Sequence, residues 1–548
     1  MSHTVAYGVA ERGTLAGRVP QHGRAGPRCP LMRLDWAAQA IRHTSSSVRT
    51  IRKVTTFHST RSSTDALTSK QAIRKGIADD GGLFVTDQLG ETTVDISALA
   101  GKSYQQIAFD VLSVLLPDFG EDELKQCIAE AYGSQWSDER ITPVKPLGDD
   151  YVMELFNGPT CAFKDVALQI LPRFMARTTP ADGDADEKIM IVTATSGDTG
   201  KAALAGFADA AGTGITVFYP QGRVSRVQEL QMTTQTGSNV HVCAVNGNFD
   251  DAQSTVKEIF GDQELAERLA ADDHVVLSSA NSINVGRLVP QVVYYFSAYA
   301  QLLEQQVINV GDEVDFVVPT GNFGDVLAGY YAKMLGLPVR QLVVASDKNN
   351  VLFDFLTTGT YNRNRPFYET ISPSMDILIS SNLERMLYYM AEKDPRLITY
   401  LMNDLAQYGA YEVPPQLLAQ IRQLFATGWA DEDQVRQMIA ECWRDNHYVI
   451  DPHTACGYFV MRQMPADPGT PRVLLSTASP YKFPRVVNEA LGLKADGTDF
   501  ECMDELAAAT GTEVPAMLRG LESADVRFRD CVEVSDMAHY VEQCANRL

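Results

Sequence analysis

The chain has 548 residues, of which 45% are hydrophobic and 21% charged, and its formal net charge is −22. This composition is ordinary for a globular protein of about three domains, and the acidity disfavours general binding to nucleic acid or to an anionic membrane. No run reaches the roughly 18 uncharged apolar residues of a membrane helix, so residues 288–303 are predicted to form a buried helix. Nine cysteines without a CxxC pair favour a reducing compartment over a disulfide framework or a zinc ribbon.

The first 53 residues differ in composition from the rest. They carry eight Arg and one Lys against two acidic residues, Glu11 and Asp35, and residues 31–53 are rich in Arg and Ser. This pattern is typical of a mitochondrial transit peptide, and equally of a disordered basic leader or of a start placed too far upstream. We therefore separate residues 1–53 from the fold. We expect a cytoplasmic protein, with the mitochondrion as the alternative that the leader allows.

Residues 54–150 predict a small N-terminal domain. A helix is expected in the segment that starts at Thr64 and ends at Gly81-Gly82, followed by a short strand. Two further helices are expected in residues 103–116 and 122–133, because their apolar residues recur at helical spacing.

After Tyr151, short apolar strands alternate with helices. Strands are predicted at residues 188–193, 215–219, 240–245, 275–278, 314–318, 342–345 and 473–476. Helices are predicted at residues 199–211, 250–260, 325–336 and 484–491, with a charged helical segment at 383–445. This alternation is typical of an α/β fold with mainly parallel, helix-covered sheets. We assign residues 151–495 to a catalytic α/β region of two subdomains and residues 496–548 to a helical and strand tail.

Two polar, glycine-rich turns stand where a strand is expected to end and a helix to begin, which is where open α/β sheets bind ligands. The first runs from Thr195 to Gly200 (TSGDTG) and the second from Thr320 to Asp325 (TGNFGD). Free N–H groups at a helix N-terminus suit a carboxylate or a phosphate, although a well-capped helix or a plain glycine turn would look the same. The second turn matches neither GxGxxG nor GxxxxGK[ST], so a dinucleotide or nucleoside triphosphate is disfavoured.

The third turn, GPTCAFKD at residues 158–165, places Lys164 among small and apolar residues. A buried lysine has a lowered pKa and can form a Schiff base as a neutral amine. For an isolated lysine, solvation or a salt bridge to the neighbouring Asp165 is the commoner outcome. The three turns together provide what a pyridoxal-phosphate (PLP) enzyme acting on an amino acid needs, namely one lysine, one loop for the cofactor phosphate and one for a substrate carboxylate.

Five segments resemble, in the same order, those of threonine synthases of the fungal and enterobacterial type: ELFNGPTCAFKD, ATSGDTG, SANSINVGR, VPTGNFGD and LSTASPYKF. FHSTRSST and ADDGGLFV are also similar to the family's YxSTRG and GGLFxP segments, so the resemblance spans residues 55–491. It implies fold type II of the PLP enzymes. The chain departs from the family at Ser62, where Gly is usual, and at residues 479–483, where His-Pro-Ala-Lys-Phe is common.

The resemblance also implies individual roles. Lys164 is the catalytic Schiff-base lysine, and the loop around the cofactor phosphate consists of Gly321, Asn322, Phe323, Gly324 and Asp325. The hydroxyl of Thr477 faces the pyridine nitrogen, which a hydroxyl leaves largely unprotonated. Substrate binding is expected from Thr195, Ser196, Gly197, Asp198, Thr199, Asn281, Ser282, Asn284, Arg287 and Lys482.

Arg287 and Lys482 are the candidates for binding a substrate phosphate, because cations form strong hydrogen bonds to phosphate oxygens. For Arg287, a surface position beside a capped helix is an equal alternative. Ser59, Thr60 and Arg61 are the next candidates. The segment 451–454 contains one histidine, His453, without a second ligand at metal spacing, so no metal site is predicted.

The resemblance implies that the chain is a lyase that converts O-phospho-L-homoserine and water to L-threonine and phosphate, the last step of threonine biosynthesis. A serine/threonine dehydratase of the same fold is the alternative enzyme, and it needs no site for a substrate phosphate. A catalytically silent PLP-binding homologue is the alternative of another class. The expected partner is the small-molecule substrate, without nucleic acid or membrane, and the choice between monomer and homo-oligomer stays open.

Overall fold

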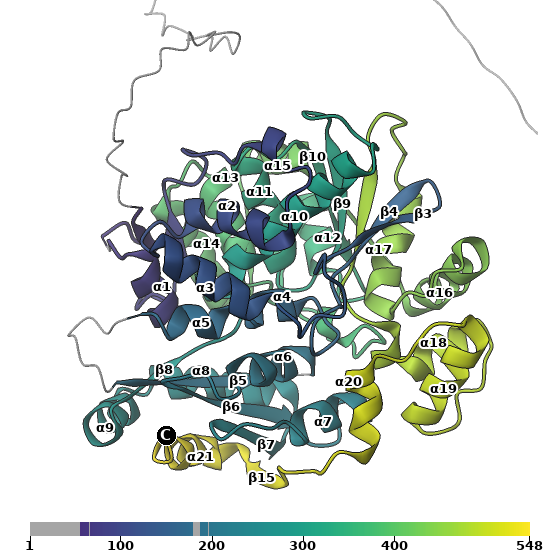
Figure 1. Ribbon diagram of the computed structural model, residues 1–548. Helices are drawn as coiled ribbons and strands as arrows, with labels where there is room; N and C mark the ends of the chain where they lie inside the picture. Colours follow the sequence, from purple (N-terminus) through teal and green to yellow (C-terminus); the bar gives the residue numbers. More distant parts are fainter. Residues whose placement is uncertain (1–54, 65, 179–186, 196) are drawn as a thin grey trace, which may run out of the picture. The chain divides into compact units, whose positions relative to one another are not determined.

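The computed structural model describes residues 55–548 except 65, 179–186 and 196. The chain divides into two units, residues 1–52 and 53–548, and only the second is described below (Figure 1). The expected basic leader lies outside the described residues. Within the described part, no helix is both long and apolar enough to span a membrane.

The N-terminal segment contains a two-stranded antiparallel sheet and three helices. Its elements are β1 (Phe57–Ser59), α1 (Ser69–Lys75), β2 (Phe84–Thr86), α2 (Tyr104–Leu115) and α3 (Glu121–Ala131). The helices predicted at 103–116 and 122–133 are confirmed. The first helix is shorter than predicted, because Gly76 adopts a φ of 77° and ends it well before Gly81.

The larger sheet has six strands in the order β13-β10-β9-β14-β4-β3, and every neighbouring pair is parallel except β3 and β4. Its strands are β3 (Val144–Leu147), β4 (Asp150–Glu154), β9 (Val314–Pro319), β10 (Val339–Ser346), β13 (Phe425–Trp429) and β14 (Arg472–Ser476). The strands β9, β14 and β4 are neighbours and run in one direction. Their carboxyl ends therefore meet at one edge of the sheet, where the site forms.

The smaller sheet has five strands, all parallel, in the order β15-β7-β6-β5-β8. They are β5 (Lys188–Ala194), β6 (Thr213–Pro220), β7 (Val240–Asn246), β8 (Val275–Ser278) and β15 (Asp530–Glu533). All eight residues of β6 are buried, as expected for a parallel strand covered on both faces. Figure 1 shows β15 and the C-terminal helix α21 (Met537–Ala545) against this sheet.

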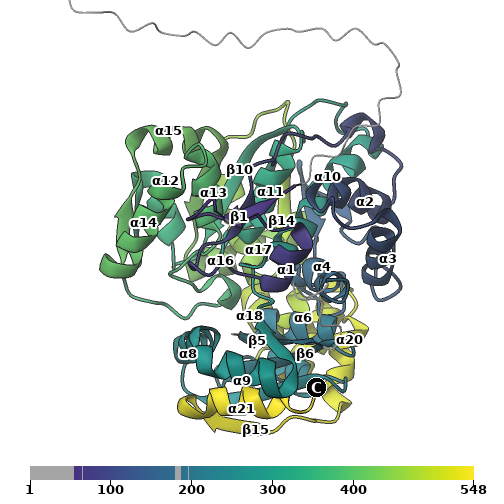
Figure 2. The same ribbon diagram turned by 90° about the vertical axis from the view of Figure 1, so that its left-hand side faces the viewer.

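Helices cover both sheets (Figures 1 and 2). Those of the first half are α4 (Lys164–Leu168), α5 (Leu171–Met175), α6 (Asp198–Phe207), α7 (Arg226–Thr233), α8 (Phe249–Gly261), α9 (Gln263–Asp273) and α10 (Val285–Glu304). Those of the second half are α11 (Gly324–Met334), α12 (Val351–Thr358), α13 (Leu383–Met390), α14 (Pro395–Tyr408), α15 (Pro415–Leu424), α16 (Glu432–Asn446), α17 (Pro452–Gln463), α18 (Pro484–Leu491), α19 (Asp499–Thr510) and α20 (Ala516–Arg519). The predicted buried helix at 288–303 is confirmed, since α10 is buried from Val285 to Leu302.

The helical segment predicted at 383–445 is interrupted by two strands. Of these, β12 (Ala410–Glu412) pairs with β11 (Thr360–Asn362), and β13 pairs in parallel with β10. The strand β13 has no alternating pattern of its own. It forms because β10 would otherwise have an open edge, and the backbone groups of residues 425–429 pair with that edge.

Candidate active site

The loop that carries Lys164 is attached to the end of β14. Leu155 N–H donates to the Ser476 carbonyl at 2.9 Å, and Phe163 N–H donates to the Thr477 carbonyl at 2.8 Å. Ser479 N–H in turn donates to the Cys161 carbonyl at 3.1 Å. These bonds place the predicted lysine beside Thr477 at the edge where β4 and β14 end.

Lys164 is the first residue of α4 and is only 8% exposed. Burial lowers the pKa of its amine to about 8, although Asp198 opposes the shift. Its Nζ donates to Ser374 Oγ at 3.2 Å and lies 3.9 Å from Asp198 Oδ2. Asp165 is not its partner, because the Asp165 carboxylate accepts from the N–H and hydroxyl of Thr160 at 2.8 and 2.6 Å. The lysine is thus buried without a tight ion pair, as nucleophilic chemistry requires.

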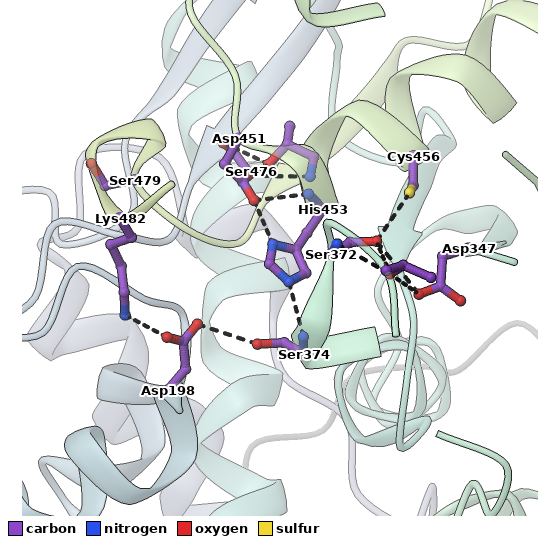
Figure 3. Close-up of polar contacts among 12 residues, drawn as sticks. Asp198, Asp347, Ser372, Ser374, Asp451, His453, Cys456, Ser476, Ser479 and Lys482 are labelled. Carbon is purple, nitrogen blue, oxygen red and sulfur yellow. Dashed lines mark hydrogen bonds and ion pairs between the residues drawn. The ribbon is translucent and has the colours of Figure 1, made fainter. Parts of the chain in front are cut away.

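Asp198 is the acidic centre of the site (Figure 3). Its Oδ1 accepts from Lys482 Nζ at 2.7 Å and from Gln228 Nε2 at 3.0 Å, and its Oδ2 accepts from Ser374 Oγ at 3.3 Å. Burial alone would raise the pKa of Asp198, but the charges of Lys482 and Lys164 outweigh it and hold that pKa well below its usual range. The carboxylate therefore remains charged and balances two buried lysines.

The TSGDTG turn follows β5 and starts α6. Thr195 Oγ1 accepts from the N–H groups of Gly197 and Gly200 at 3.0 and 2.9 Å. Ser196 lies outside the described residues, and Thr199 is half-buried in the first turn of α6. Because the side chain of Asp198 is paired with cations, only backbone N–H groups and hydroxyls of this turn can bind a substrate carboxylate.

The TGNFGD turn follows β9, and Phe323 ends it with a φ of 63° just before α11. Residues far along the chain bond to the carbonyl groups of this turn. Ser380 Oγ donates to Gly321 O at 2.8 Å, and Asn382 N–H donates to Asn322 O at 3.1 Å. Asp325 accepts from the hydroxyls of Tyr294 and Tyr295 at 2.6 and 3.0 Å, and burial raises its pKa to about 6. This carboxyl group cannot bind a phosphate, but the N–H groups of the turn can.

An unpaired buried donor beside this turn fits an anionic group of the cofactor. Within the described residues, Asn382 Nδ2 is buried without a hydrogen-bond acceptor; Arg287 Nε is also buried and unpaired. A Cβ placed on Gly324 would lie 3.4 Å from Asn382 Nδ2 and 3.5 Å from the Ser282 Cβ. Buried donors are normally paired, so a phosphate at the start of α11 would supply the hydrogen-bond acceptor that Asn382 Nδ2 lacks.

The segment 281–287 is brought against the same turn. Asn284 caps α10, because its Oδ1 accepts from Gly286 N–H. Its Nδ2 donates to the carbonyl groups of Ile73 and Ser279. Asn281 Oδ1 accepts from Thr193 Oγ1 at 3.0 Å. Arg287 is buried rather than on the surface, it donates to the Ala280 carbonyl at 3.0 Å, and burial lowers its pKa to about 10.

The residues Ser59, Thr60 and Arg61 contact carboxylates. Ser59 Oγ donates to Asp80 at 2.7 Å, while Thr60 Oγ1 and both arms of Arg61 donate to Glu384, at 2.5 Å and at 2.9 and 2.8 Å. Glu384 lies on α13, which begins next to Asn382. The structure therefore places these residues near the second turn, with their side chains already paired.

The sequence does not identify three residues of the site: Gln228, Ser374 and Asn382. The segment ISPSMDILISSN at 371–382 has neither helical nor strand periodicity, so one sequence offers no signal for it. The sequence gives His453 no second metal ligand, and within the described residues no group of three or more His, Cys, Asp or Glu is placed to hold a metal. Instead, His453 contacts Asp451 and Ser374.

Comparison with known proteins defines the class and then the family. The family described as "Pyridoxal-phosphate dependent enzyme" matches residues 145–400, so this α/β chain is a PLP-dependent enzyme of fold type II, as its motifs implied. The flanking regions match "Threonine synthase N terminus" at residues 56–132 and "Threonine synthase, C-terminal" at residues 454–541. The chain belongs to the threonine synthase family.

Individual relatives agree with this assignment. The chain is 39% identical over 472 residues to threonine synthase of Schizosaccharomyces pombe, covering 80% of this chain and 90% of that protein. It is 38% identical over 439 residues to human "Threonine synthase-like 1", covering 77% of this chain and 58% of that protein. The structure of PLP-bound threonine synthase from Brucella melitensis superimposes with a TM-score of 0.80 at 37% identity, covering 90% of this chain and 99% of that one.

Proposed function

We propose that this chain converts O-phospho-L-homoserine and water to L-threonine and phosphate, and that Lys164 is the lysine that binds PLP. One observation carries the proposal. A buried lysine with a lowered pKa lies where β4, β9 and β14 end, in a chain that matches the threonine synthase family in its N-terminal, central and C-terminal parts.

The residues present fit the cofactor. The N–H groups of residues 321–325 and the amide of Asn382 would hold its phosphate, and Thr477 lies beside the lysine loop to meet its ring. When bound, PLP withdraws electrons from the bonds at the substrate Cα. The Lys164 amine, with a pKa of about 8, can accept a proton there and return it.

The substrate needs a second set of contacts. The Thr195–Gly200 turn would bind the carboxylate through N–H groups and hydroxyls. For the substrate phosphate, Arg287 is the better of the two candidates, because its Nε is buried and unpaired, whereas Lys482 already has Asp198 as its partner. Ser282 and Asn281 lie on the same segment as Arg287. Asn281 accepts from Thr193 at the end of β5, and Ser282 lies close to Gly324 at the start of α11.

The alternatives differ in measurable products. A dehydratase would deaminate threonine and would not require Arg287. A silent homologue would bind PLP without turnover. Supplying O-phosphohomoserine to the purified protein should release phosphate and threonine in equal amounts. Phosphate release without threonine, faster loss of threonine than its formation, or no turnover by PLP-loaded protein would each reject the proposal.

The lysine assignment is tested separately. Borohydride reduction of the PLP-loaded protein followed by peptide mapping should label Lys164, and Lys164→Ala should abolish turnover. The matched control is Lys201→Met, because Lys201 is also an inward-lying lysine whose pKa burial lowers to about 8. The control variant should keep the label on Lys164. A label on Lys201 in the unmodified chain would refute the assignment.

A further inference from the structure

Ser374 bridges the two charged groups at the centre of the site. Lys164 Nζ and Asp198 Oδ2 are 3.9 Å apart, which is too long for a hydrogen bond. Ser374 Oγ lies between them, accepting from Lys164 at 3.2 Å and donating to Asp198 at 3.3 Å. The amine therefore reaches its counter-charge through this hydroxyl.

A buried histidine fixes the backbone of Ser374 (Figure 3). Ser374 N–H donates to His453 Nε2 at 3.1 Å, and His453 Nδ1 contacts Asp451 Oδ2 at 2.6 Å. Because Nε2 accepts a hydrogen bond, it carries no proton, and Nδ1 is the donor to Asp451. His453 is 2% exposed and Asp451 is fully buried, so these hydrogen bonds are shielded from water.

Asp451 is itself held by the start of α17. It caps this helix by accepting from the N–H groups of His453 and Thr454 at 2.9 and 3.2 Å. The Thr454 hydroxyl also donates to Asp451 and lies 3.1 Å from Ser476 Oγ. Ser476 is the last residue of β14, next to Thr477. His453 therefore lies near the carboxyl end of β14, to which the loop that carries Lys164 is also hydrogen-bonded.

The segment 370–376, here called the site strap, also lies directly on the second turn. A Cβ on Gly321 would be 3.0 Å from the Ser374 carbonyl oxygen and 3.4 Å from the Met375 Cα. Two observations therefore locate Ser374 independently: the close approach to Gly321 from one side and the bond to His453 from the other.

We propose that Ser374 is a positioning residue for Lys164, and that Asp451 and His453 place Ser374 for that task. The hydroxyl holds the lysine amine in one direction and links it to the Asp198 carboxylate, so that a proton on the amine is stabilised at the site. This inference rests on the assignment of Lys164 in the proposed function. The bridge has a measurable consequence, because its loss should make the amine easier to deprotonate.

Other charged groups also act on Lys164 and must stay in place during the test. They come from five elements around it: Asp198, Arg287, Lys482, Asp165 and Asp325. Ser374→Ala changes none of these charges and removes no backbone hydrogen bond. A shift in the pKa of Lys164 would then report the bridge itself.

The experiment compares three variants of the full-length chain. Ser374→Ala removes the bridge, and Ser374→Thr restores a hydroxyl. Ser372→Ala is the matched control, since Ser372 is buried in the same strap but its hydroxyl contacts Asp347 and Cys456 rather than Lys164. The pKa of Lys164 is measured from the pH dependence of its reductive methylation after cofactor removal, and kcat and KM are measured against pH in the loaded enzyme.

We expect Ser374→Ala to lower the pKa of Lys164 and to reduce kcat about tenfold with little change in KM, the size of one lost hydrogen bond. Ser374→Thr should recover both values, and Ser372→Ala should leave the pKa of Lys164 unchanged. If Ser374→Ala does not fold, Ser374→Cys keeps the shape with a weaker bond and should lower the pKa in the same direction. An unchanged Lys164 pKa in a folded Ser374 variant would overturn the proposal.

The role of His453 is tested by the same readout. His453→Phe removes the acceptor and should reproduce the pKa shift of Ser374→Ala, while His453→Gln retains an acceptor and should recover part of it. A lower melting temperature in His453→Phe with an unshifted Lys164 pKa would show a structural role only. If borohydride labels another lysine, the proposed function fails first and this inference with it. A label on Lys164 with no effect of Ser374 rejects the inference alone.

Discussion

Asp198 is a buried carboxylate whose nearest cation is the fully buried Lys482, at 2.7 Å. Removing one partner of such a pair leaves an uncompensated buried charge, whereas replacing both partners is far less costly. We therefore expect Lys482→Met to lower the free energy of unfolding by about 3–5 kcal/mol. The double variant Asp198→Asn/Lys482→Met should recover much of that loss. Urea unfolding of the two single variants and the double variant measures the coupling.

An exposed pair provides the control for this prediction. Lys75 and Asp79 also lie 2.7 Å apart, but their side chains are 38% and 87% exposed. Lys75→Met should cost less than about 1 kcal/mol, because water screens such pairs. Equal losses for Lys482→Met and Lys75→Met would mean that burial does not govern the energy of the Asp198 pair.

Arg287 has one satisfied arm and one buried, unpaired Nε. If this group binds the substrate phosphate, Arg287→Ala should reduce kcat/KM for O-phosphohomoserine by about ten- to a hundredfold, the loss of one or two charged hydrogen bonds. The absorbance of bound PLP and its response to serine should not change. Arg173→Ala is a suitable control, because Arg173 also donates to one backbone carbonyl, that of Gly206, but lies on α5. Normal kinetics of Arg287→Ala would place the phosphate elsewhere.

At the scale of elements, two carboxyl groups, those of Asp347 and Asp376, bind the first residue of the site strap, Thr370. Asp376 accepts from the N–H and hydroxyl of Thr370 at 2.8 and 2.7 Å, and Asp347 accepts from the same hydroxyl at 3.1 Å. Burial, together with the nearby Asp347, raises the pKa of Asp376 to about 8. The pair therefore shares a proton at neutral pH. The other charged or titratable groups that contact the strap include Lys164, Asp198, Glu432, Cys456 and His453.

This raised pKa gives a stability prediction with a definite sign. The folded chain keeps a proton on Asp376 that the unfolded chain loses above its ordinary acidic pKa, so the contribution is present at low pH and is lost as the pH rises through about 8. Asp376→Asn mimics the protonated form. The melting temperature of Asp376→Asn should therefore fall less between about pH 5 and about pH 9 than that of the unmodified chain. These pH values lie about three units below and about one unit above the pKa of Asp376.

A neutral change in the same cluster separates titration from packing. Ser372→Ala removes a hydroxyl near Asp347 and cannot titrate. It should lower the melting temperature by a similar amount at every pH, whereas Asp376→Asn should change the slope. Parallel melting curves for Asp376→Asn and the unmodified chain would show that this carboxyl group does not control the pH dependence.

At the scale of the whole molecule, the C-terminal segment completes the smaller sheet. The strand β15 pairs with β7, and α21 buries Met537, Val541 and Cys544 in the core of that sheet. Each fully buried apolar side chain contributes about 1.5–3 kcal/mol, and a domain has only about 5–15 kcal/mol of net stability. Deleting residues 524–548 should therefore yield a chain that aggregates or melts far below the full-length protein in a thermal unfolding assay.

Shortening the other end is the matched comparison. Removing residues 1–53 takes away no residue of the described core, which begins at Phe57, so the melting temperature and the binding of PLP should be retained. If the C-terminal deletion is as stable as this N-terminal one, β15 and α21 are not part of the cooperative unit.

The sequence by itself determined the class of fold and the position of the three turns that follow strands. Short buried strands such as β6 appear as continuous apolar runs, and the glycine-rich turns follow them at the expected spacing. These signals are local, because an apolar run of strand length, or a glycine at the end of a strand, reflects backbone geometry within a few residues. The sequence motifs also carried the family assignment, since GPTCAFKD and TGNFGD lie in one chain in the family's order.

Only the tertiary structure decided which side chains face one another. Ser374 reaches Asp198 across 176 residues and His453 across 79, and neither its Ser-Pro-rich segment nor the isolated histidine signals a partner. The strand β13 likewise exists because β10 offers it an edge. Such contacts depend on how separate elements pack. A local sequence pattern does not indicate which distant residue a side chain will contact. The turn that carries Lys164 could therefore be located in the sequence, whereas the contacts of Lys164 with Ser374 and Asp198 could not.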